Sequence, residues 1–179
     1  MRILLIALLV LSSSQAIAST YRGFSACTNF ACRNNVNTSL RDSEWQQVRN
    51  LLKAAGNPQE ERMQIKQAIG LLETLVGEKT GTKVDLPGNQ RPENYRGQLD
   101  CTAEAINTTT YLRLIENDGL LRWHKVHDRV VRDRLWMVPH WTGVIEDTTT
   151  GVKYSVDSWF KKNGDAPVVV TLERWYNKK

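Results

Sequence analysis

The sequence predicts an α+β fold in which N-terminal helices and a central, cysteine-bearing helix pack on an antiparallel β-sheet. Apolar residues recur at helical spacing in three segments, residues 45–55, 65–76 and 101–116. From residue 120 onward the period changes, and segments rich in Val, Trp, Tyr and Thr alternate with turn residues. Helices followed by strands in this order are typical of the α+β class.

Residues 1–18 predict a signal peptide. Arg2 gives a short positive start, residues 3–10 are almost wholly apolar, and Ala16 and Ala18 form the small-x-small pattern that signal peptidase recognises. The apolar run is too short to span a membrane, which takes about 20 residues. We therefore expect cleavage after Ala18, a periplasmic or secreted protein, and no membrane insertion of the mature chain.

Length and charge limit the possible classes of protein. The mature length, about 160 residues, fits one domain, which we assign to residues 43–179 after an irregular segment at 19–42. The formal net charge is +5, and Arg2 leaves with the signal peptide, so the mature chain carries +5 − 1 = +4. The positive charges are scattered among acidic neighbours and form no basic stripe with aromatic residues, which argues against a nucleic-acid partner.

Three cysteines remain after cleavage. Cys27 and Cys32 are close enough to form a local disulfide in an oxidising compartment, which would pin the N-terminal segment and leave Cys101 as a free thiol. A free thiol in an exported protein has two explanations. It is either buried as a small apolar residue or used in catalysis.

Two helices are predicted before the cysteine helix. Ser43 with Gln46 three residues later reads as a capping box, and Gly56 should end the helix that follows. The second helix starts at Asn57-Pro58, with Asn as N-cap and Pro at the first helical position, and should end at Gly77.

A Gly/Pro-rich loop over residues 79–98 leads to the third helix. Asp100 can cap that helix, which is expected to run from Cys101 to Glu116 and to end at residues 117–119. Three or four antiparallel strands should follow, over residues 120–131, 136–146, 152–160 and 168–175.

The position of Cys101 suggests a nucleophile. At the first turn of a helix, the backbone N–H groups and the helix dipole favour an anion, and the reactive form of cysteine is the thiolate. The same N–H groups can stabilise the oxyanion of a tetrahedral intermediate. Glu104, one turn further on, could tune the site, but a solvated helix face is the favoured interpretation for it.

Such a thiol needs a base, and His140 is the favoured histidine. His124 and His127 lie three apart on a predicted strand, so they face opposite sides and are expected at the surface or rim. Asp157 could orient the His140 imidazole.

The hairpin register decides whether His140 and Asp157 can meet. If Glu146 faces Gly151 across a loop at residues 147–150, His140 faces Asp157 directly. A shift of one residue would send the two side chains to opposite faces of the sheet. The sequence permits the required register but does not force it.

The order of Cys at a helix start, His in a strand and Asp in the next strand resembles the transglutaminase-like branch of the papain-like cysteine enzymes, in its bacterial exported type. The match covers residues 65–175. Its most specific part is His140-Trp141, followed after the hairpin by Asp157 and Trp159. Two departures stand out: the chain has Ser158 where the family usually has Pro, and Gly97 lies four residues before the cysteine rather than two.

The resemblance implies a papain/transglutaminase-like core and a thiol hydrolase or acyl transferase acting on a peptide or amide bond. Cys101 would be the nucleophile, His140 the base and Asp157 its orienting partner, with a peptide or protein as substrate and no cofactor. The family usually places a polar or aromatic group just upstream of the cysteine to hold the oxyanion, and Gln98, Tyr95 and Asn94 are the candidates here.

Two alternatives from other classes stay open. The same scaffold could serve as a non-catalytic binding module, or the chain could be a structural envelope protein. A metal site is not expected, because no Cys/His pair has the spacing of zinc ligands and a single free thiol is expected. The sequence does not address the oligomeric state.

Overall fold

The structure is a computed structural model that describes residues 20–53, 55–89, 96–133 and 139–177. The predicted signal peptide, residues 1–18, lies outside these ranges. The helices are α1 (Asp42–Leu51), α2 (Pro58–Thr80), α3 (Cys101–Asn117) and α4 (Leu172–Asn177), with short 3-10 turns at Thr20–Arg22, Phe30–Cys32 and Thr82–Val84. The strands are β1 (Phe24–Cys27), β2 (Asn35–Thr38), β3 (His124–Arg132), β4 (His140–Asp147), β5 (Lys153–Asp157) and β6 (Val168–Thr171).

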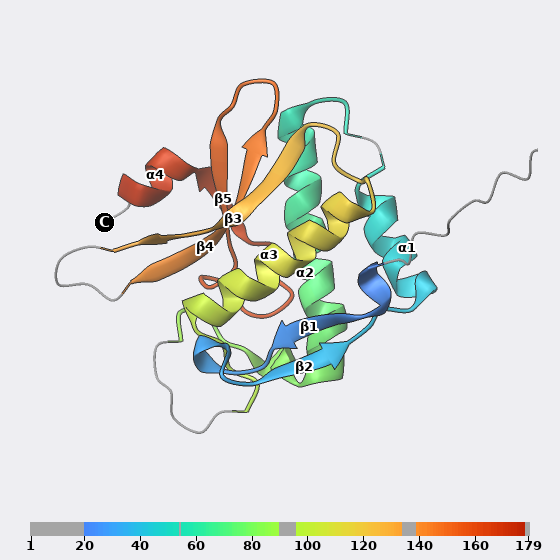
Figure 1. The fold of residues 1–179 in the computed structure, drawn as a ribbon, viewed down its shortest axis with the longest axis vertical. Coiled ribbons are helices and arrows are strands. Elements are labelled where there is room, and N and C mark those ends of the chain that lie inside the picture. The colour runs from blue at the N-terminus through green and yellow to red at the C-terminus, as the bar shows by residue number, and fades with distance from the viewer. Residues whose placement is uncertain (1–19, 54, 90–95, 134–138, 178–179) are drawn as a thin grey trace, which may run out of the picture.

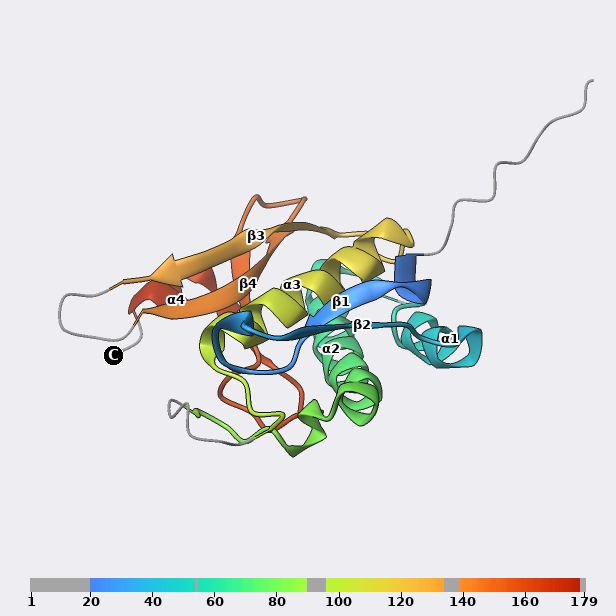
Figure 2. The ribbon, with the colours of Figure 1, turned by 60° about the horizontal axis from the view of Figure 1, so that its bottom comes forward.

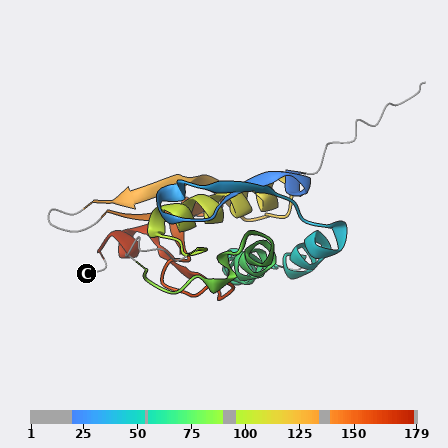
Figure 3. The ribbon, with the colours of Figure 1, turned by 90° about the horizontal axis from the view of Figure 1, so that it is seen from below.

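The molecule is built around α3, and its α+β class agrees with the prediction. Strands β3 to β6 form one antiparallel sheet in sequential order, and α3 packs against its β3 and β4 strands (Figure 1). The β1–β2 hairpin lies along α3, as the view of Figure 2 shows. Seen from below, α2 lies on the other side of α3 from this hairpin (Figure 3).

We expected an irregular N-terminal segment at residues 19–42, but the structure contains a β-hairpin there. Strands β1 and β2 pair antiparallel, with Cys27 opposite Asn35, and a disulfide joins Cys27 to Cys32 within the connecting turn. The side-chain amide of Asn107 on α3 bonds both backbone groups of Cys27, at 2.7 and 3.1 Å. The hairpin is therefore fastened to α3 by a tertiary contact that local sequence signals do not report.

Helix α1 starts and ends earlier than predicted. Its N-cap is Arg41 rather than Ser43, because the carboxylate of Glu44, at the third helical position, accepts a hydrogen bond of 2.8 Å from the Arg41 backbone N–H. The helix ends at Leu51, so Gly56 is not its terminator.

Helix α2 starts where the sequence predicts but ends later. The Asn57 side chain caps the Glu60 backbone N–H at 2.9 Å. The helix runs through Gly77 to Thr80 and is capped by Gly81 at φ 86°. Gly77 serves close packing instead, because a Cβ atom there would lie 2.7 Å from Oδ1 of Asn163.

The predicted strands differ from the observed ones in where they begin and end. Strand β3 begins at His124 rather than residue 120, and β5 ends at Asp157 rather than residue 160. The predicted last strand, residues 168–175, is split between β6 and the short helix α4. This division matters for the site, because it brings Trp175 onto a helix that folds back over the sheet.

The β4–β5 register is shifted by two residues from the predicted one. Gly143 pairs with Val156 and Glu146 with Lys153, so continuing the ladder by one residue sets Asp157 opposite Thr142. His140 is therefore a diagonal neighbour of Asp157 rather than its direct partner. A shift of two keeps both side chains on one face, since strand side chains alternate with a period of two.

The main core lies between the helices and the sheet. Its largest fully buried members include Trp45, Ile65, Ile69, Leu72, Leu112, Ile115 and Ile145. Gly143 lets α3 approach β4 closely, because a Cβ atom there would lie 3.2 Å from Cγ2 of Thr108. Within the described ranges, no helix combines the length and apolar character needed to cross a membrane.

Candidate active site

Cys101 is the first residue of α3, and the chain before it is held firmly. Asp100 caps the helix by accepting from the Ala103 backbone N–H at 2.9 Å, and the same oxygen accepts from the Ala31 N–H at 2.9 Å. The Asp85 carboxylate accepts from the Leu99 N–H at 2.7 Å. These bonds tie the helix start to the N-terminal hairpin and to the preceding loop.

The thiol of Cys101 is free and nearly buried. Its Sγ lies 3.6 Å from the carbonyl oxygen of Pro139, the residue before His140. No acceptor among the described residues binds the backbone N–H groups of Cys101 or Thr102. Both groups therefore remain available to an anion at the positive end of the helix dipole.

His140 begins β4 and is held by Asp157 at the end of β5. Its Nε2 lies 2.7 Å from Oδ2 of Asp157, and an ionised carboxylate can only accept, so Nε2 carries a proton. Nδ1 is then the ring nitrogen left for the thiol. The arrangement gives the acceptor–imidazole–thiol order that a thiol nucleophile needs.

The electrostatics of His140 favour its charged form. Burial alone would lower the pKa of the imidazole, but the hydrogen bonds and negative charges of Asp157 and Cys101 outweigh it and raise the pKa to about 9. At neutral pH the ring is then an imidazolium, which would stabilise a thiolate beside it.

Aromatic rings enclose the imidazole. The rings of Trp159, Phe160 and Trp175 lie with their centroids 4.9, 5.2 and 5.7 Å from that of His140. Trp175 also donates its indole N–H to Oδ2 of Asp157 at 2.8 Å. Sequence reasoning missed this contact, because Trp175 was interpreted as the end of a strand.

Of the three candidate oxyanion donors upstream of Cys101, the structure describes only Gln98. Asn94 and Tyr95 lie outside the described residues. The Gln98 amide is engaged with the preceding loop: its oxygen accepts from the Leu86 N–H at 3.1 Å and from Asn89 at 2.9 Å, and its nitrogen donates to the Val84 carbonyl. The contacts of Gln98 thus brace the loop that leads to Cys101.

Buried carboxyl groups lie behind the site, and Glu104 is one of them rather than a solvated helix residue. Burial raises the pKa of Glu104 well above its ordinary value, and the charges of Glu73 and Asp85 raise it further. Burial also raises the pKa of Asp85, although a hydrogen bond with Glu104 opposes the shift. Their shared hydrogen bond raises the pKa of Glu104 and lowers that of Asp85, so Glu104 carries the proton and donates it to the Asp85 carboxylate.

The third buried acid, Glu73, lies near Ser158. Burial raises the pKa of Glu73 to about 7, against hydrogen bonds from Ser158 and the Gly164 N–H that lower it. The Ser158 hydroxyl also lies 3.2 Å from that of Thr108 on α3. A proline at this position would leave Thr108 without this partner.

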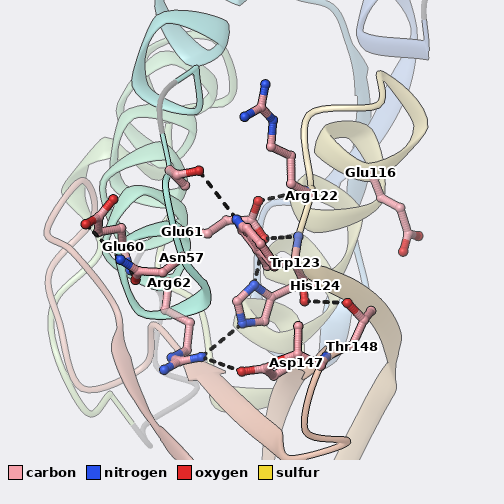
Figure 4. Close-up of polar contacts among 12 residues, drawn as sticks. Asn57, Glu60, Glu61, Arg62, Glu116, Arg122, Trp123, His124, Asp147 and Thr148 are labelled. Atoms are coloured by element: carbon pink, nitrogen blue, oxygen red, sulfur yellow. Dashed lines mark hydrogen bonds and ion pairs between the residues drawn. The ribbon is translucent and has the colours of Figure 1, made fainter.

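His124 is buried inside a separate polar network, which corrects the expectation that it lies at the surface or rim (Figure 4). Its Nδ1 lies 2.7 Å from Oε2 of Glu61. The same oxygen accepts from the Trp123 backbone N–H at 3.0 Å, and Oε1 of Glu61 accepts from the Arg122 N–H at 2.7 Å. Arg62 lies 3.2 Å from the other ring nitrogen and 3.3 Å from Oδ2 of Asp147.

This network occupies the Nε2 of His124 and leaves it no free nitrogen for a nucleophile. An arginine can only donate, so Nε2 must accept and the proton sits on Nδ1. His127 is half-buried and pairs with Glu146 at 2.8 Å. Within the described residues, His, Cys, Asp and Glu form no group of three suited to a metal ion.

Comparisons with family models, with curated proteins and with solved structures found no match for this chain. Its function must therefore be argued from the geometry of its own side chains.

Proposed function

We propose that the protein is a transglutaminase-like thiol hydrolase or acyl transferase, exported from the cell, that acts on a peptide or amide bond. The observation that carries this proposal is the buried contact of 2.7 Å between His140 and Asp157, beside a free thiol at a helix start. The packing of α3 on the sheet that holds both residues supports a papain/transglutaminase-like core.

The reaction would start from an ion pair of the Cys101 thiolate and the His140 imidazolium, in which the thiol proton already resides on His140. The thiolate attacks the carbonyl carbon, and the oxyanion is stabilised by the N–H groups of Cys101 and Thr102. His140 then protonates the leaving amine as the tetrahedral intermediate collapses to a thioester. Water or a second amine, deprotonated by His140, attacks the thioester and releases the acid or the new amide.

Two features support an extracytoplasmic setting for this chemistry. The Cys27–Cys32 disulfide is compatible with an oxidising compartment. The sequence of residues 1–18 carries the signal-peptide pattern. An oxidising compartment also makes the retention of a reduced Cys101 costly unless the thiol has a role.

Alkylation by iodoacetamide at about pH 6 tests the proposal. An ordinary thiol, with a pKa of about 8.5, is less than about one per cent ionised there. We expect the wild-type protein to react at least roughly tenfold faster than a peptide thiol, and His140→Ala to lose most of that advantage. Cys101→Ala should fold with a stability loss of about 1 kcal/mol and should take up no label.

His127→Ala is the matched control, because it removes a histidine paired with a carboxylate on the same sheet. It should leave the reaction rate unchanged. A wild-type thiol that reacts no faster than the peptide thiol, with no dependence on His140, would favour the binding module over the enzyme.

A further inference from the structure

We propose that Trp175 is a positioning residue that holds the Asp157 carboxylate toward His140, an inference that rests on the proposed thiol chemistry. Asp157 Oδ2 accepts two hydrogen bonds, one from His140 Nε2 at 2.7 Å and one from Trp175 Nε1 at 2.8 Å. The indole N–H is a donor only, so it can have no other role at this oxygen.

Burial makes this second donor important. The residues Asp157 and Trp175 are almost completely buried, at 2% and 1% exposed. A carboxylate removed from water depends on protein donors, and its torsion is free unless such donors restrain it. The Trp175 ring also stacks on the imidazole at an interplanar angle of 29°. One residue therefore restrains both members of the His140–Asp157 pair.

Trp175 is itself held in place by Arg132 of strand β3, which pairs with β4. Arg132, at the end of β3, is the ladder partner of His140. Its guanidinium donates to the Trp175 carbonyl at 2.7 Å and lies 4.8 Å from the centre of the Trp175 ring. The β3 strand thereby fixes α4 against the same end of the sheet from which His140 projects.

The hydrogen bond sets Trp175 apart from the other tryptophan on the imidazole. Trp159 lies closer to His140, at 4.9 Å between ring centres, but its indole N–H donates to the Asn89 carbonyl at 3.2 Å. Packing on the imidazole is thus common to both residues. The bond to Asp157 belongs to Trp175.

Trp175→Phe tests the proposal, because it keeps an aromatic ring over His140 and removes the N–H donor. The first measurement is the iodoacetamide rate of Cys101 at about pH 6. We expect a loss of roughly tenfold, the scale of one hydrogen bond to a charged group. In an Asp157→Ala background the same substitution should change the rate by less than about twofold, because a residue acting through Asp157 has nothing left to position.

A second measurement follows the His140 imidazole by NMR titration. The bond to Asp157 contributes to the raised pKa of about 9, and a carboxylate free to rotate should let the midpoint fall toward about 6.5. Trp45→Phe is the matched control: Trp45 is fully buried and donates to the Asp118 carboxylate at 2.9 Å, at the opposite end of α3. It should lower stability without changing the rate or the midpoint.

Three outcomes would overturn the role of Trp175. They are an unchanged rate in Trp175→Phe, an equal loss in the wild-type and Asp157→Ala backgrounds, and a His140 midpoint that rises. If the wild-type thiol reacts no faster than a peptide thiol at about pH 6, the proposed enzymatic function fails as well. Activated wild-type thiol with an unaffected Trp175→Phe variant refutes the positioning role alone.

Discussion

His140 and Asp157 meet through a contact of 2.7 Å whose two side chains are only 8% and 1% exposed. The pair bridges the start of β4 and the end of β5, so its geometry depends on the hairpin as a whole. Because water is excluded, the charge of the carboxylate acts on the imidazole with little screening. The contact is therefore the point at which sheet structure and thiol chemistry are coupled.

Asp157→Asn should weaken the reactivity of Cys101 without abolishing it. The amide keeps the shape of the carboxylate but removes its charge and can present the wrong group to the imidazole. We expect the pKa of His140 to fall from about 9 toward its ordinary value of 6.5. NMR titration of the imidazole and the iodoacetamide rate at about pH 6 measure the two effects.

Asp157→Asn should also change how the free energy of unfolding depends on pH. A histidine whose folded pKa is raised stabilises the protein fully below pH 6.5, and this contribution is lost as pH rises toward 9. Asp157→Asn should flatten that decline in the free energy of unfolding. A variant that keeps the wild-type decline between these pH values would show that Asp157 is not its cause.

Glu73→Gln should stabilise the protein at alkaline pH. The unfolded chain releases this proton near pH 4.5, whereas the folded protein holds it until about pH 7. Stability from this group therefore falls as pH rises across that window and is flat above it. Replacing the acid should raise the free energy of unfolding at about pH 8 by about 2 kcal/mol, measured by urea denaturation.

Glu78→Gln provides the control on the same helix, because Glu78 is 60% exposed and pairs with Lys83 at the surface. Its effect should be below about 1 kcal/mol at every pH. Glu73→Gln should also lose its advantage at about pH 4, where the wild-type side chain is protonated in both states. A variant destabilised at about pH 8 would contradict the direction of the Glu73 shift.

His124→Ala should destabilise the fold and leave the thiol unaffected. Removing the imidazole strips Glu61 of a buried partner at 2.7 Å and breaks the link to Arg62. Breaking one side of a buried pair costs about 3 kcal/mol, which a denaturation curve would detect. The iodoacetamide rate of folded His124→Ala should match wild type, and a loss of rate would mean that this network also supports the site.

The disulfide determines how many free thiols the protein should contain. Unreduced, unfolded protein should give one free thiol per chain, because Cys27 and Cys32 are joined and Cys101 is free. Replacing both bonded cysteines with Ser should lower the free energy of unfolding by about 2 kcal/mol, since the closed loop is short. Three free thiols, or a bridge that includes Cys101, would contradict the structure.

Several elements could be derived from the sequence because their causes are local. The starts of α2 and α3 depend on the side chains of Asn57 and Asp100 reaching backbone N–H groups three residues on. The disulfide depends on two cysteines five residues apart. The α+β class follows from the change of hydrophobic period along the chain. Such signals act over one or two turns and need no tertiary partner.

Other features came only from the tertiary structure. The burial of Glu104 and His124 depends on partners that lie far away in the sequence, Asp85 for the first and Glu61 for the second. The two-residue register shift is equally invisible, because alternation specifies which face a strand side chain takes but not which diagonal neighbour it meets.

The residues of the candidate site divide in the same way. Cys101, His140 and Asp157 could be selected from their order and spacing, since a helix start and two adjacent strands limit where they can lie. Trp175 could not, because its contact with Asp157 requires β6 to end at Thr171 and α4 to turn back over the sheet. The hydrogen-bond partners of Trp175 lie 18 and 43 residues away in the sequence, and no local pattern records such contacts.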